Sequence, residues 1–82
     1  MRLLSEGRAM KIIATYAGRS RSGHHLLKNL DGDLKRDHAW LNYPRSGFPE
    51  GVPVGARIRF YADLFYRYEG PRLTDVREVS VI

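Results

Sequence analysis

The chain has 82 residues, a hydrophobic content of 43% and a formal charge of +5, with a pI near 10.0. This length supports one domain with a small core, and the absence of cysteine excludes disulfides and thiolate chemistry. The sequence shows neither an apolar run of membrane-spanning length nor a signal segment, so we expect a cytoplasmic protein without a membrane partner. Its basic charge fits a polyanionic partner, although many proteins of similar charge bind none.

The N-terminal residues 1–9 show no clear periodicity. We interpret them as a leader, either a disordered extension from an upstream start or a short helix packed on the domain, which then covers residues 10–82. The first strand is predicted from Lys11 to Gly18. In an extended strand successive side chains point to opposite faces, so one face of this strand carries Ile12, Ala14 and Tyr16.

Two further strands are predicted in the first half of the chain. A polar, basic loop over 19–23 leads into a strand from His24 to Leu30, which ends at the hairpin turn signal of residues 31–33, Asp-Gly-Asp. A third strand is expected over 37–43, with Ala39 and Leu41 on one face and His38 and Trp40 on the other.

The segment 44–55 alternates proline and glycine with other residues. Proline removes backbone donors and glycine costs conformational entropy, so this segment excludes a regular helix. We expect at most one helical turn, near residues 48–52.

The long strand expected over 56–68 is the most informative stretch of the chain. Its inner row is apolar and contains Ile58, Phe60, Ala62, Leu64, Tyr66 and Tyr68. Its outer row mixes guanidinium groups with aromatic rings and contains Arg57, Arg59, Tyr61, Asp63, Phe65 and Arg67. Arginines interleaved with rings are typical of a surface that contacts phosphates and stacks bases, although the same residues are compatible with a solvated strand.

A turn over 69–71 precedes the last predicted strand, Leu73 to Ile82. Its apolar set is Leu73, Val76, Val79, Val81 and Ile82. The three-residue spacing from Leu73 to Val76 departs from the two-residue period of a strand and predicts a β-bulge.

Five strands joined by turn signals, with no helical pattern, predict an all-β fold. A five-stranded OB-fold barrel fits this length best, because it places a connection between its third and fourth strands, where the proline- and glycine-rich segment lies. The alternative is an SH3-like small barrel, which usually has shorter strands than the one around Phe60.

Three segments carry a resemblance to a known group of proteins. They read KIIATYAG over 11–18, DHAWLNY over 37–43 and GARIRFYA over 55–62. Together with the closing RLTDV over 72–76, they resemble small single-domain OB-fold proteins that are related to single-strand nucleic-acid binders and are common in phages, plasmids and other mobile elements. The resemblance implies binding of single-stranded nucleic acid. We expect DNA in preference to RNA, although the residues themselves do not distinguish the two, and we do not expect the acidic tail of bacterial single-strand-binding proteins.

The candidate nucleic-acid contacts follow from this fold, whose ligands usually lie across the second and third strands. They are Arg19, Arg21, His25, Lys28, His38, Trp40, Arg57, Arg59, Tyr61, Phe65 and Arg67. Trp40 is the sharpest hypothesis, because its indole can stack on a base. The alternative is that it points inward and fills the core.

The sequence does not indicate an enzyme. His24 and His25 are adjacent and point to opposite faces of a strand, so they cannot chelate one ion together, and no glycine-rich phosphate loop precedes a helix. We expect no cofactor and no metal. The competing hypothesis is a protein-interaction module or a homo-oligomer, because tyrosine, tryptophan and arginine also dominate protein interfaces.

Overall fold

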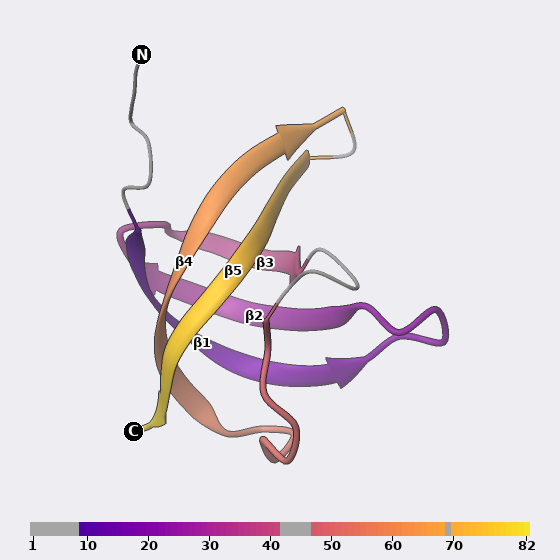
Figure 1. Ribbon diagram of the computed structural model, residues 1–82, viewed down its shortest axis with the longest axis vertical. Coiled ribbons are helices and arrows are strands. Elements are labelled where there is room, and N and C mark those ends of the chain that lie inside the picture. The colour runs from indigo at the N-terminus through magenta and orange to yellow at the C-terminus, as the bar shows by residue number, and fades with distance from the viewer. Residues whose placement is uncertain (1–8, 42–46, 69) are drawn as a thin grey trace.

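The alternating apolar residues form five strands in a computed structural model, which describes residues 9–41, 47–68 and 70–82 (Figure 1). The strands are β1 (Met10–Arg19), β2 (His25–Gly32), β3 (Arg36–Leu41), β4 (Arg57–Arg67) and β5 (Gly70–Val81). They close into a barrel in the order β1-β2-β3-β5-β4, with β4 paired back to β1. All pairs are antiparallel except β3 with β5, which is parallel. The predicted all-β barrel of five strands is therefore confirmed, and its architecture is that expected of an OB-fold.

The predicted inner faces fill the barrel. Ile12, Ala14, Ile58 and Phe60 are fully buried, and Leu41 joins them from β3. β4 and β5 rise steeply past β1, β2 and β3, so their joined ends project beyond the barrel (Figure 1). The inner row of β4 leaves the core there.

The core ends before the last positions of the apolar rows. Tyr66 and Tyr68 are 69% and 101% exposed, because they lie on the projecting end of the hairpin rather than over the barrel. Val81 and Ile82, at the opposite end of β5, are also mostly exposed. The core is therefore shorter than the apolar rows of the sequence indicate.

The predicted bulge in the last strand is present, and a second one follows it. Pairing advances two residues along β4, from Tyr61 to Asp63, while it advances three along β5, from Arg77 to Thr74. The same mismatch occurs between Arg59 and Tyr61. Asp75 and Glu78 adopt the left-handed φ values that such bulges require. At each bulge the extra residue increases the spacing between inward-facing residues of β5 from two positions to three.

The two bulges explain an unusual apolar spacing in β5. Leu73 and Val76 are buried, and Val79 packs against the core, so residues three apart share the inner face. The extra residues also bend the strand around the barrel. The apolar residues of β5 are therefore three positions apart, a spacing that resembles that of a helix, although β5 is a curved strand.

The described part of the segment that enters β4, residues 47–56, closes one end of the barrel and contains no helix, within the limit of one helical turn set by its prolines and glycines. It forms turns at 50–51 and 54–55, and Gly55 N donates to Tyr16 O at 2.7 Å. Phe48 is buried, with its ring centroid 5.0 Å from that of Tyr16. The Phe48 side chain thus covers this end of the barrel, a position that a helix could also have covered. The described residues contain no helix that could cross a membrane.

The β2–β3 connection depends on glycine at one position. Gly32 has φ +90°, and a Cβ at this position would lie 2.5 Å from the carbonyl oxygen of Lys11. That oxygen already accepts a hydrogen bond from Asp33 N at 2.8 Å, which holds the two backbones close together.

We expect Gly32→Ala to lower the free energy of unfolding by about 1–3 kcal/mol, because it combines a strained φ with a backbone clash. Gly51→Ala is the matched control, since Gly51 has φ +87° with no atom within 4 Å of the added Cβ. Urea denaturation of both variants measures the difference. Equal losses would show that the clash at Gly32 is relieved at no cost.

Candidate binding surface

Four adjacent strands contribute one row of side chains to the outside of the barrel. Leu26 of β2 pairs with Trp40 of β3, Trp40 pairs with Arg72 of β5, and Arg72 pairs with Phe65 of β4. Direct partners in a sheet lie about 5 Å apart and point to the same face. The row therefore places a guanidinium group between two aromatic rings.

Trp40 lies on the outer face, so the alternative that it fills the core is wrong. Its neighbours Ala39 and Leu41 are buried, whereas Trp40 itself is half-buried. The His24 ring meets the indole edge-on, with centroids 6.4 Å apart and planes at 88°. This contact orients the indole and leaves part of it open to solvent.

Two hollows adjoin Trp40 and Arg72. The first is lined by Ser20, Ser22 and His24 together with these two residues. The second is lined by Arg36, His38, Ala39 and Pro71 together with the same two. Both hollows are lined in part by histidine and arginine side chains. The Trp40–Arg72 pair thus forms the ridge between two depressions that could receive flat or charged groups.

A second row of outer residues runs beside the first. Arg57 of β4 pairs with Thr15 of β1, Thr15 with Lys28 of β2, and Lys28 with His38 of β3. Lys28 and His38 are each two residues from a member of the first row, so the two rows are neighbours on the same face. We call the combined set the Trp40 surface; it comprises Leu26, Lys28, His38, Trp40, Arg57, Phe65, Arg67 and Arg72.

The Arg57 side chain is held in place by two hydrogen bonds within the protein. Its Nη1 atom donates to Asn29 O at 2.8 Å and to Thr15 Oγ1 at 3.1 Å. A guanidinium group has five N–H donors in a fixed plane, so donors remain for a ligand. The side chain is thereby ordered before any partner arrives, which reduces the entropy lost on binding.

The projecting hairpin extends the Trp40 surface. The Arg67 guanidinium lies 5.8 Å from the centre of the Phe65 ring, within the range of a cation–π interaction. Phe65 is thus flanked by Arg67 on its own strand and by Arg72 on the next one.

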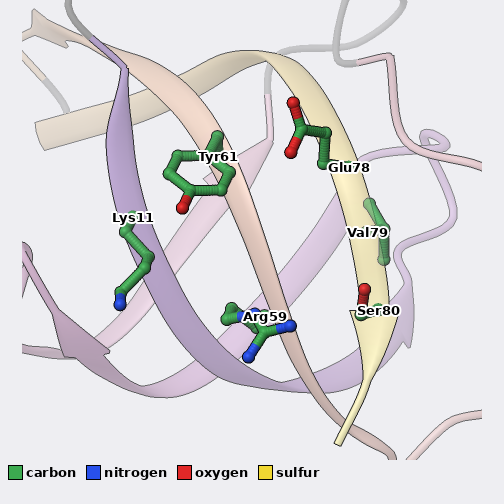
Figure 2. Close-up of a pocket in the computed structure, with 6 residues that line it drawn as sticks. All are labelled: Lys11, Arg59, Tyr61, Glu78, Val79 and Ser80. Carbon is green, nitrogen blue, oxygen red and sulfur yellow. The ribbon is translucent and has the colours of Figure 1, made fainter.

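Arg59 and Tyr61 lie in a separate hollow between β1, β4 and β5 (Figure 2). It is lined by Lys11, Arg59, Tyr61, Glu78, Val79 and Ser80. The outer row of β4 therefore does not form one flat face. Because β4 is coiled, its outer side chains face different neighbours. Arg57 faces β2, Arg59 and Tyr61 face the bulged part of β5, and Phe65 lies toward Trp40.

His25 is the one predicted contact residue that the structure does not place at the surface. It is only 6% exposed, and Tyr16 Oη lies 2.7 Å from its Nδ1 atom. Its ring centroid is 4.7 Å from that of Phe48. The cause is strand alternation, because His25 is two residues from the buried Leu27 and shares its face.

The contacts of His25 determine its protonation. Arg19 Nη2 lies 3.3 Å from Nε2, and because a guanidinium group can only donate, Nε2 accepts. The neutral ring therefore carries its proton on Nδ1 and donates to Tyr16. Burial lowers the pKa of His25 and the charge of Arg19 lowers it further, against the opposing effect of Glu50. Burial likewise raises the pKa of Tyr16.

The two predicted arginines of the first loop occupy different surroundings. Arg19 pairs with Glu50 at 3.5 Å and contacts His25, so it joins the loop to the closing segment. Arg21 is exposed beside Ser20 and Ser22, which line a hollow of the Trp40 surface. Arg21 is thus well placed to reach a ligand, whereas Arg19 mainly supports the fold.

Several residues of these surfaces were missed by the sequence-based prediction, among them Arg72, His24 and Lys11. Arg72 and His24 lie against Trp40, and Lys11 lies in the hollow with Arg59. Arg72 could not be placed because it reaches Trp40 through the parallel β3–β5 pairing. The position of Lys11 could have been inferred from alternation, since it lies opposite the face of Ile12.

In chemical terms, the Trp40 surface offers exposed rings and cationic donors. Over the described ranges, no cluster of three or more His, Cys, Asp or Glu side chains could hold a metal ion. No family model, curated protein or solved structure matches this chain. Function is therefore argued from the fold and the surface chemistry.

We expect His25 to make stability dependent on pH. Its folded-state pKa lies below the ordinary value of 6.5, so the unfolded chain binds more protons between these two values and stability falls as the pH drops through this window. Urea denaturation at several pH values in this window measures the free energy of unfolding. The slope of this free energy against pH should be smaller for His25→Gln than for the original chain. His38→Gln, which changes an exposed histidine, is the control and should retain the slope; equal slopes in all three proteins would contradict this assignment.

Proposed function

We propose that this protein binds single-stranded nucleic acid, DNA in preference to RNA, with little sequence preference. The observation that carries the proposal is the row of Leu26, Trp40, Arg72 and Phe65 across four strands of the barrel. The row lies over β2 and β3, where OB-fold proteins usually bind oligonucleotides. The preference for DNA is part of the proposal, and a comparison of oligo-dT with oligo-U tests it.

The spacing of rings and cations favours a single strand over a duplex. Bases must be unpaired and turned outward to stack on Trp40 or Phe65, and every base has a face that can stack. Arg72 lies between these rings and can contact the phosphate that links two stacked bases. Such contacts read the backbone and the ring faces, so they discriminate little between bases.

The cations of the Trp40 surface supply the electrostatic part of the binding. Lys28, Arg57, Arg67 and Arg72 could neutralise up to four phosphates, at about 0.7 per contact for a single strand. The logarithm of the binding constant should therefore fall with the logarithm of salt concentration with a slope of about −2 to −3. Arg21 could add a further contact from the first loop.

A second candidate function is protein recognition at the projecting hairpin. Tyr66 and Tyr68 are strongly exposed there, beside Arg67. Tyrosine and arginine are enriched at interface hot spots. This alternative predicts a dimer or a partner complex that tolerates loss of Trp40.

Fluorescence anisotropy with labelled oligo-dT and oligo-U, across a salt titration, tests the proposed function. We expect Trp40→Ala to weaken binding by about 5- to 100-fold, because stacking on one base contributes about 1–3 kcal/mol. Trp40→Phe should retain most of the affinity. Lys35→Ala is a control for charge, since Lys35 pairs with Asp31 at 3.8 Å outside the Trp40 surface.

Light scattering on the same samples distinguishes the alternative. Absence of oligonucleotide binding at low salt, together with a dimeric mass, would reject the proposed function and favour protein recognition. Salt-sensitive binding by a monomer that is lost in Trp40→Ala would support nucleic-acid binding.

A further inference from the structure

The hollow that contains Arg59 holds two cationic side chains that form no ion pair within the described part of the chain. Arg19, Lys35 and Arg77 are each ion-paired with a carboxylate. By contrast, neither Lys11 Nζ nor the Arg59 guanidinium has a hydrogen-bond or ion-pair partner within ranges 9–41, 47–68 and 70–82. These two cations outnumber the one carboxylate of the lining, Glu78, so the hollow carries an excess of positive charge.

The hollow also presents neutral donors beside these cations. Tyr61 and Ser80 contribute hydroxyl groups to the lining. Figure 2 shows the ends of Lys11 and Arg59 and the Tyr61 hydroxyl directed toward one side of the hollow, with the Glu78 carboxylate at the other side. An anionic oxygen could therefore approach Lys11 and Arg59 while remaining apart from Glu78.

The hollow is continuous with the Trp40 surface along β4. Arg59 and Arg57 are two residues apart on the outer face, and Arg57 leads through Thr15 to Lys28 and His38. Asp31, which pairs with Ile13 beside this path, is itself neutralised by Lys35. The route from Arg59 to Trp40 thus crosses cationic and neutral side chains.

The length of this route fits a short oligonucleotide. Two steps of two residues at about 3.3 Å per residue and three strand spacings of about 4.8 Å give a path of about 28 Å. At a stacked spacing of about 3.4 Å per nucleotide, this path corresponds to about eight nucleotides. This value lies within the range of about 4–16 nucleotides that one OB-fold occupies.

We propose that the hollow formed by Lys11, Arg59, Tyr61 and Ser80 is a second phosphate subsite, which holds the backbone of a strand that continues from the Trp40 surface. This inference rests on the proposed function and assigns it a defined path around the barrel. Short oligonucleotides occupy only the part of the Trp40 surface around Trp40, and longer ones also reach the hollow. Glu78 limits the affinity of the subsite for phosphate.

The test compares oligo-dT of about 4 nucleotides with oligo-dT of about 12 nucleotides, both within the usual range of site sizes. Arg59→Ala and Lys11→Ala should each weaken binding of the longer oligonucleotide by about tenfold at low salt, and lower its salt slope by about 0.7. Binding of the shorter oligonucleotide should stay within about twofold of the original chain.

Glu78→Gln provides a variant that should gain affinity, so loss of folding cannot mimic its effect. Removing this carboxylate should tighten binding of the longer oligonucleotide by about two- to threefold and leave the shorter one unchanged. If Arg59→Ala affects both lengths equally or neither, the second subsite is rejected while the proposed function stands. If the original chain binds neither length, both proposals fail.

Discussion

The parallel pairing of β3 with β5 is the constraint on which both the core and the proposed site depend. Only two residue pairs are in register along this seam, Trp40 with Arg72 and Leu41 with Leu73. The leucine pair is fully buried and completes the core, while the tryptophan and arginine face outward. Because strand alternation couples the two faces, packing Leu41 against Leu73 also sets the position of Trp40 against Arg72.

The bulges of β5 determine how the cationic surface is distributed. A regular strand would have kept the outer row of β4 opposite one straight partner. Instead, the extra residues at Asp75 and Glu78 curve β5, so that successive outer residues of β4 face different neighbours. The barrel therefore presents guanidinium groups around its circumference rather than on one flat face, as a flexible polyanion that wraps the protein would require.

Local patterns predicted most of the fold and part of the site. The two-residue period identified the inner faces of β1, β3 and most of β4, because burial on one side of a strand leaves a clear trace in the sequence. Arg72 was missed because a parallel pairing between distant segments leaves no local signal. His25 was misplaced although its spacing from Leu27 indicated the core. The bulge at Asn29, which lets Lys28 face outward and Leu30 inward, depends on a left-handed φ that the residue type permits but does not require.

The separation between the barrel core and the projecting end of the β4–β5 hairpin has an evolutionary consequence. Residues 65–68 and 70–72 of the hairpin contribute no member to the buried cluster, so substitutions there are subject to weak selection for stability. Changes can therefore accumulate at the hairpin tip while the barrel beneath remains intact.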